Sequence, residues 1–368
     1  NYGQYTADAR SVDTFVHDKK DLTPIFSVGD RGSFGASQVS SPATGKNVIA
    51  VGASTTGVPG TPSAGAVVNF SSLGPSLDGR IKPDVVAPGV GLCSGLAEEA
   101  QSPAGASCLS GNHAGGNAYY MTLSGTSQAT AIASGVAGLT REFIREQVGI
   151  AAPSSALVKA AMINGARDLG TADIPNAAEG WGEVDLERTV LPMDGTTVLD
   201  TFVDDKKSLS PGFGLLYSFS IDASHGLDMT LAWTDEAGSA IASQTESRLV
   251  NDLDLVLIGP DGTEWLGNDF SQGYSTTGGT ADDLNNVERI RVAPGVLPAG
   301  TDNYIVKVMH RGGTAQDFAL VLSAVATATP QPDLAVFDGS ILLSSENPLK
   351  DDLISIRLAW VNQGTTSA

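Results

Sequence analysis

The stretch Leu123–Thr130 reads LSGTSQAT and opens the longest helical pattern of the chain. From there to Gln147, apolar residues recur on one face at the spacing of an α-helix. Gly125 permits a turn that bulkier residues resist, and Ser127 then falls in the first helical turn. The backbone amides of such a turn are free and form the positive end of the helix dipole. This position suits a nucleophile whose reaction intermediate carries an oxyanion, and it equally suits an ordinary helix cap.

Helical and strand patterns alternate through residues 1–192. Predicted helices cover 7–20, 127–147 and 154–165, and predicted strands cover 22–28, 48–53 and 67–70. This alternation predicts an α/β domain with a parallel sheet that is covered on both faces. Gly135 and Gly138 interrupt the longest predicted helix, and a glycine inside a helix costs about 1 kcal/mol. We therefore expect another segment to pack closely against these two positions.

The pattern changes near Leu191, and no helical periodicity follows between 195 and 326. Predicted strands cover 215–221, 229–233, 253–258, 287–292, 304–309 and 318–323. Turn sequences such as GPDG at 259–262 separate them, which favours an antiparallel sandwich or jelly roll over 193–326. A linker is expected over 327–332. Residues 333–368 predict two more strands and are too few for a stable sandwich, so they indicate part of a third β module.

Charge and cysteine content narrow the classes of function. The formal net charge is −20, with 41 acidic and 21 basic residues, which argues against binding nucleic acid or an anionic membrane through the overall field. An acidic surplus fits calcium binding, a salty environment or plain solubility. No apolar run is long enough for a transmembrane helix. Cys93 and Cys108 could form a disulfide in an oxidising compartment or remain unpaired.

Further motifs accompany GTSQAT in a fixed order. They read FSVGDRG at 26–32, FSSLGP at 70–75, KPDVVAPG at 82–89 and GWGEV at 180–184. Together they resemble the subtilase family of serine proteases, although Gln128 and Ala131 replace a Met and a Pro of the family's serine box. Three more motifs resemble the β-barrel domain of large alkaline subtilases, namely VNDLDL at 250–255, GNDF at 267–270 and NNVE at 285–288. The segment from Asp333 is similar to CARDB-type adhesion modules.

The resemblance implies a secreted endopeptidase that acts on protein or peptide substrates with Ser127 as its nucleophile. Subtilases also need an Asp and a His, which precede the serine along the chain. None of the four histidines lies in a His-Gly-Thr-His box; they are His17, His113, His225 and His310. We therefore expect the catalytic Asp and His to precede Asn1 and these 368 residues to be inactive by themselves. The alternative is an inactive subtilase scaffold that serves in binding or adhesion.

The resemblance also implies roles for residues around the serine. Asp30 stands where the family has its oxyanion-binding asparagine, and an ionised carboxylate only accepts hydrogen bonds, whereas a protonated one could donate. Further residues expected to bind substrate are Ser27, Val28, Gly29, Gly125 and Thr126. Within this set, the backbone of 27–29 is expected to pair with an extended peptide.

Acidic residues of the second domain indicate a structural calcium site, although the chemistry itself requires no cofactor. The candidate ligands are Asp252, Asp254, Asp269, Asp282 and Asp283. Carboxylates are the hard oxygen ligands that Ca²⁺ prefers, but the spacing matches no EF-hand loop. Ordinary carboxylates in loops and at strand edges are the alternative.

Overall fold

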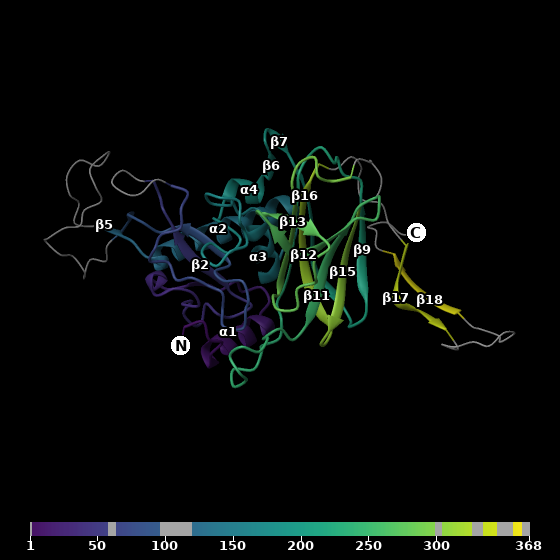
Figure 1. Ribbon diagram of the computed structural model, residues 1–368, viewed down its shortest axis with the longest axis horizontal. Coiled ribbons are helices and arrows are strands. Elements are labelled where there is room, and N and C mark those ends of the chain that lie inside the picture. Colours follow the sequence, from purple (N-terminus) through teal and green to yellow (C-terminus); the bar gives the residue numbers. More distant parts are fainter. Residues whose placement is uncertain are drawn as a thin grey trace.

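The computed structural model describes residues 2–57, 64–95, 120–298 and 304–325, and the backbone of 334–343 and 356–362. An α/β part and a β-sandwich lie side by side in it (Figure 1). This confirms the predicted fold class, a partial parallel α/β region followed by a mostly antiparallel sandwich. No helix in the described part of the chain is both long and apolar enough to cross a membrane.

The α/β part contains a parallel sheet in the order β1-β2-β3. Its strands are β1 (Ile25–Ser27), β2 (Ile49–Ser54) and β3 (Val85–Pro88). All six residues of β2 are buried, which is typical of a parallel strand covered on both faces. In register, Val51 of β2 pairs with Ser27 on one side and Val85 on the other.

The described residues of this part form four α-helices: α1 (Ala7–Asp18), α2 (Thr126–Phe143), α3 (Ser155–Asn164) and α4 (Leu186–Val190). A 3-10 turn, η1 (Gly32–Phe34), follows β1, and a π-helical turn, η3 (Ile144–Val148), ends α2. Ser154 caps α3, because its hydroxyl accepts a hydrogen bond from Leu157 N at 3.0 Å.

The sandwich consists of two antiparallel sheets. The four-stranded sheet runs β14-β10-β16-β8 and contains β8 (Asp200–Leu209), β10 (Leu227–Trp233), β14 (Val287–Val292) and β16 (Gln316–Ala324). The five-stranded sheet runs β13-β12-β11-β15-β9 and contains β9 (Gly214–Phe219), β11 (Asp252–Ile258), β12 (Glu264–Ser271), β13 (Tyr274–Thr277) and β15 (Tyr304–Gly312). Alternate side chains, such as Leu253, Leu255 and Leu257, fill the space between the sheets.

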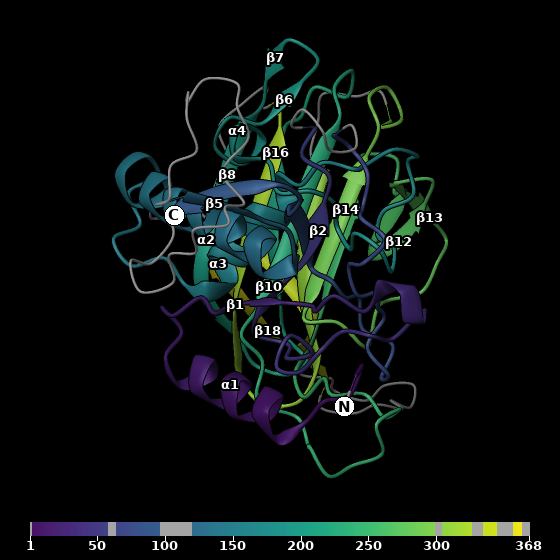
Figure 2. The same cartoon turned by 90° about the vertical axis from the view of Figure 1, so that its left-hand side faces the viewer.

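Helix α3 joins the two parts. All ten of its residues are buried, and it packs against α2 on one side and against β10 and β16 on the other (Figure 2). Ala232, Ala319 and Val321 of the sandwich therefore belong to the same apolar cluster as Leu157 and Ala129 of the helices. The α/β sheet, the helices and the outer face of the four-stranded sheet thus share one core.

Three two-stranded pairs complete the described structure: β4 (Leu92–Gly95) with β5 (Tyr120–Leu123), β6 (Met193–Asp194) with β7 (Thr197–Val198), and β17 (Leu334–Leu343) with β18 (Ile356–Asn362). Cys93 on β4 is disulfide-bonded, and the other cysteine of the chain, Cys108, lies outside the described residues.

Two predictions about the α/β part were wrong. Residues 67–70 form only a single bridge, between Val67 and Ser54, because the chain turns at once and Ser71 N donates to Val68 O at 3.0 Å. Gly135 and Gly138 do not mark a close contact among the described residues. They lie on the exposed side of α2, and no atom stands within 4 Å of where a Cβ would project.

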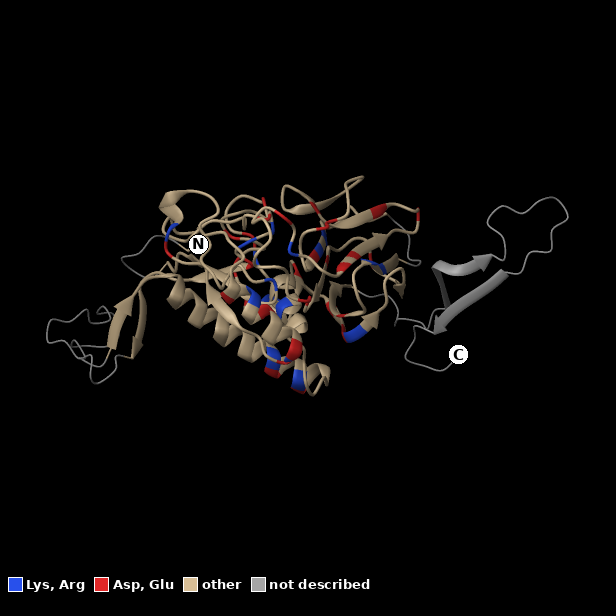
Figure 3. Cartoon of the chain, turned by 90° about the horizontal axis from the view of Figure 1, so that it is seen from below, with Lys and Arg blue, Asp and Glu red and all other residues tan. Residues whose placement is uncertain are grey.

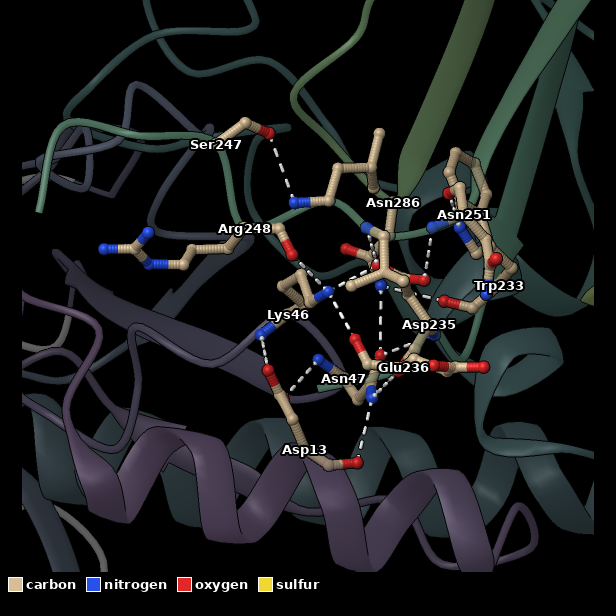
Figure 4. Close-up of polar contacts among 12 residues, drawn as sticks. Asp13, Lys46, Asn47, Trp233, Asp235, Glu236, Ser247, Arg248, Asn251 and Asn286 are labelled. Atoms are coloured by element: carbon tan, nitrogen blue, oxygen red, sulfur yellow. Dashed lines mark hydrogen bonds and ion pairs between the residues drawn. The ribbon is translucent and has the colours of Figure 1, made fainter. Parts of the chain in front are cut away.

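Charged residues of both signs occur at the junction between the α/β part and the sandwich (Figure 3). Some of them form a buried polar network that links the two parts. Lys46 is fully buried and forms an ion pair with the equally buried Asp235 of the sandwich. Its ammonium also donates to Glu236 O at 2.6 Å and Arg248 O at 2.5 Å (Figure 4). Asp13 of α1 accepts hydrogen bonds from the backbone amides of Lys46 and its neighbour, which fixes this loop against α1.

Replacing Lys46 by Met should lower the free energy of unfolding by about 3–5 kcal/mol, because Asp235 would remain as a buried anion without its cation. Urea unfolding of the purified full-length protein would measure this. Lys20→Met is the matched control, since Lys20 pairs with Asp317 across the same junction with both side chains partly exposed. That pair should contribute under about 1 kcal/mol. Equal losses in the two variants would contradict the role given to Lys46.

Candidate functional site around Ser127

Ser127 lies in the first turn of α2 and is exposed. The start of this helix faces the carboxyl ends of two strands. Gly125 N donates to Gly89 O at 2.9 Å just after β3, and Gly29 N, just after β1, donates to Thr126 Oγ1 at 3.2 Å. Ligands of open α/β sheets bind beyond the carboxyl ends of the strands. The predicted nucleophile is therefore accessible at the edge of the sheet where such sites form.

Asp30 contacts the start of α2 directly. Its Oδ1 accepts a hydrogen bond from Thr126 N at 2.8 Å, and its Oδ2 lies 3.3 Å from where a Cβ on Gly125 would project. A carboxylate here is favourable for the helix, because it satisfies a free amide at the positive end of the dipole. The same placement puts an acceptor group one residue before Ser127, where a catalytic oxyanion would need donors.

Three other predicted substrate-binding residues, Ser27, Val28 and Gly29, differ in their exposure and in the hydrogen bonds of their backbone groups. Val28 is buried, its N donates to Val51 O, and its O accepts from Ser40 N. Gly29 O accepts from Ser72 N at 2.9 Å, so both backbone groups of Gly29 are also engaged. The N–H groups of these two residues are thus engaged within the chain, while each carbonyl keeps a second lone pair, and the pairing of an extended peptide with this backbone stays a prediction. Ser27 remains partly exposed at the end of β1.

None of the histidines that the structure describes contacts Ser127. His17 lies beside Asp18 on α1, and His225 lies 3.1 Å from Asp194 Oδ2. His310 is buried and its Nε2 lies 2.5 Å from Thr314 O. His113 falls outside the described residues. The described part of the chain thus presents the serine without a general base beside it.

The structure brings Asp252 and Asp254 of β11 close to Glu288 of β14, a residue that the sequence analysis did not select. Burial and the neighbouring aspartates raise the pKa of Asp252 to about 6. Burial, followed by repulsion from Asp254, Asp282 and Asp252, raises the pKa of Glu288 well above its usual range. Glu288 alternates along β14 with Ile290 and Val292, which belong to the sandwich core, but the sequence does not show what its carboxylate meets there.

The remaining predicted calcium ligands differ: Asp282 is engaged in hydrogen bonds, whereas Asp269 Oδ2 is buried without a hydrogen-bond partner among the described residues. Both oxygens of Asp282 accept hydrogen bonds, from the Asn268 side chain, from both nitrogens of Asn285 and from Leu284 N. Asp269 lies beside Gly279, with its Oδ2 2.2 Å from where a Cβ on that glycine would project. Calcium binding stays a prediction.

A separate carboxylate group lies in the loop that follows α3. Asp168, Asp173 and Glu179 each place an oxygen within 4.8 Å of the others, and Asp173 is exposed. Glu179 is buried, and this burial raises its pKa to about 7. The side chain of Asn176 donates to both Asp173 Oδ1 and Glu179 Oε1, so hydrogen bonds within the loop account for part of this arrangement.

Comparison with known proteins relates the α/β part to serine proteases. Residues 1–182 match the Subtilase family, Peptidase S8. The serine protease/ABC transporter B family protein tagA of Dictyostelium discoideum is 33% identical over 256 residues, which cover 65% of this chain and 14% of tagA. Serine protease AprX of Bacillus subtilis is 36% identical over 101 residues, 27% of this chain and 22% of AprX. The chain thus spans only a small share of each relative.

Solved structures show a weaker likeness. A lanthipeptide protease shares 18% identity over 50% of this chain and 54% of its own, with a TM-score of 0.37. The patellamide maturation protease PatA shares 20% identity over 52% of this chain and 57% of its own, also with a TM-score of 0.37. TM-scores of 0.37 carry no argument about the fold or the function of this chain.

Proposed function

We propose that this chain carries the nucleophile of a serine endopeptidase, starting from the premise that residues 1–182 belong to the subtilase family. The observation that supports the proposal most strongly is the exposed Ser127 at the start of α2, beyond the carboxyl ends of β1 and β3. Its Oγ would attack the carbonyl carbon of a peptide bond in a protein or peptide substrate. The free amides of the first helical turn, including Ser127 N–H, would stabilise the resulting oxyanion.

The reaction also requires a base for the serine proton. A histidine oriented by an aspartate would accept this proton and later give it to the leaving amine. We propose that both come from outside the described residues, because no described histidine contacts Ser127. On this proposal the described residues supply the nucleophile, the helix amides and Asp30, and they do not hydrolyse peptides by themselves.

We further propose that the protein works outside the cell. The disulfide at Cys93 supports this, because disulfides persist in oxidising compartments and are rare in the cytosol. The acidic net charge of −20 is compatible with this location and identifies no partner by itself.

An inactive scaffold is the second candidate function. Two observations favour it: no described histidine lies at Ser127, and the acceptor Asp30 sits where an oxyanion needs donors. A subtilase fold without chemistry could still present its surface to a binding partner, since fold does not fix function.

Labelling with a fluorophosphonate probe distinguishes the two candidates. In the full-length gene product, an active enzyme should be labelled at Ser127, and Ser127→Ala should lose the label. Ser124→Ala is the matched control, because Ser124 is also exposed but accepts a hydrogen bond from Gly91 N and has no proposed role. The absence of any label at Ser127 in the folded full-length protein would favour the scaffold.

Asp30→Asn should raise kcat of the full-length protein by about 10²–10³, because an amide can donate to the oxyanion whereas an ionised carboxylate repels it. Hydrolysis of a peptide substrate at neutral pH would measure the effect. Asp21→Asn is the matched control, since it removes an exposed carboxylate near β1 and keeps the contact of Asp21 with α2, in which its backbone O accepts a hydrogen bond from Arg141. An unchanged kcat in Asp30→Asn would mean that Asp30 does not face the oxyanion.

A further inference from the structure

Arg31 places a positive charge next to the candidate site, and its side chain is partly exposed. It follows Asp30, whose Oδ1 accepts a hydrogen bond from the amide of Thr126, the residue before Ser127. Consecutive Cα atoms are about 3.8 Å apart, and one residue of an extended peptide spans about 3.4 Å. A peptide held at Ser127 therefore carries side chains within reach of a long side chain at position 31.

The turn that carries Arg31 is fixed by its backbone. Arg31 N donates to Ser72 Oγ at 3.0 Å, and Gly32 N donates to Phe70 O at 2.8 Å. A Cβ on Gly32 would lie 2.2 Å from Ser71 O, so this close approach requires glycine. The neighbouring segment thus holds the backbone of the turn, and only the side chain of Arg31 remains to be ordered.

Two aromatic rings order that side chain. Arg31 Cζ lies over the ring of Tyr2, 4.4 Å from its centroid, and over the ring of Phe34, 4.0 Å from its centroid. An aromatic ring attracts a guanidinium through its face, whereas the N–H bonds of the guanidinium point outward in its own plane. The stacking therefore holds the cation in place and leaves in-plane donors for a carboxylate.

This cation has no counter-ion among the described residues. None of the ion pairs in the described part of the chain includes Arg31, and its Nε is shielded without a hydrogen-bond partner. The rings that hold it are open to solvent, since Tyr2 is 42% exposed and Phe34 is 65% exposed. An ordered arginine without a counter-ion, on an exposed surface beside Ser127, is suited to bind an anion from outside the chain.

We propose that Arg31 binds an acidic side chain of the substrate, so that peptides with a glutamate or aspartate beside the scissile bond are preferred. Arginine forms two parallel hydrogen bonds with a carboxylate, and these charge-assisted bonds are stronger than neutral ones. Asp30 would repel the same carboxylate, but the positive end of α2 offsets its charge. This inference rests on the proposed function of Ser127 and adds a substrate class to it.

Hydrolysis of matched peptides by the full-length protein tests the proposal. Two series of peptides differ in a single residue, which is Glu, Gln or Lys. This residue lies directly before the scissile bond in one series and directly after it in the other. In one of the series, kcat/KM of wild type should be about 10-fold higher for Glu than for Gln, because hydrogen bonds between charged groups are the strong ones. The value should be lowest for Lys, which Arg31 repels.

Variants of Arg31 connect this preference to the guanidinium. Arg31→Gln should bring the ratio of kcat/KM between Glu and Gln peptides to about 1, because it removes the charge. Arg31→Lys should keep a reduced ratio, because an ammonium retains the charge and loses the planar fork, and this variant decides if Arg31→Gln does not fold. Arg10→Gln is the matched control, since it makes the same change at an exposed arginine of α1, and it should keep the wild-type ratio.

Labelling of Ser127 with the fluorophosphonate probe separates two ways of failing. If Ser127 is labelled and wild type cleaves Glu and Gln peptides equally in both series, the role of Arg31 is wrong, whereas the proposed nucleophile stands. A preference that both Arg31 variants keep in full also overturns the role of Arg31. If Ser127 is not labelled, the proposed function fails and the role of Arg31 fails with it.

Discussion

The complete burial of α3 is the constraint on which the rest of the structure depends. A ten-residue helix with no exposed side needs apolar partners all round, and α2 and the four-stranded sheet provide them. The one cationic side chain on this helix, Lys159, forms an ion pair with Asp84 at 2.9 Å and donates to Lys46 O and Val48 O at 3.0 Å each. The helix therefore fixes β2 and β3 as well as α2, and the start of α2 carries Ser127.

At the candidate site, the position of Asp30 concerns both the stability of α2 and the proposed reaction at Ser127. A carboxylate at the start of a helix stabilises it, and Asp30 does so through Thr126 N. A developing oxyanion needs the same kind of donor in the same place. On the proposed function, a single side chain thus occupies a position where helix capping and transition-state stabilisation would compete, and in this structure Asp30 caps the helix.

Sequence alone predicted those elements in which local pattern and tertiary packing agree. The strands β11 and β14 and the helix α3 follow from the periodicity of their apolar residues. β8 was missed because its sequence, DTFVDDKKSL, is charged, which is common on an edge strand with one open side. β12 and β13 were missed as well, since a bulge breaks their alternation. Glu288 could not be chosen from sequence, because only the tertiary structure brings it close to Asp252 and Asp254.

The buried pair of Lys46 and Asp235 bears on how this protein can change over evolutionary time. Both side chains are fully shielded from solvent, and each belongs to a different part of the molecule. A chain that exchanged its sandwich for an unrelated one would leave the buried ammonium group of Lys46 without the carboxylate of Asp235. The two regions must therefore be inherited together, and recombination between relatives should keep its crossovers away from the boundary between them.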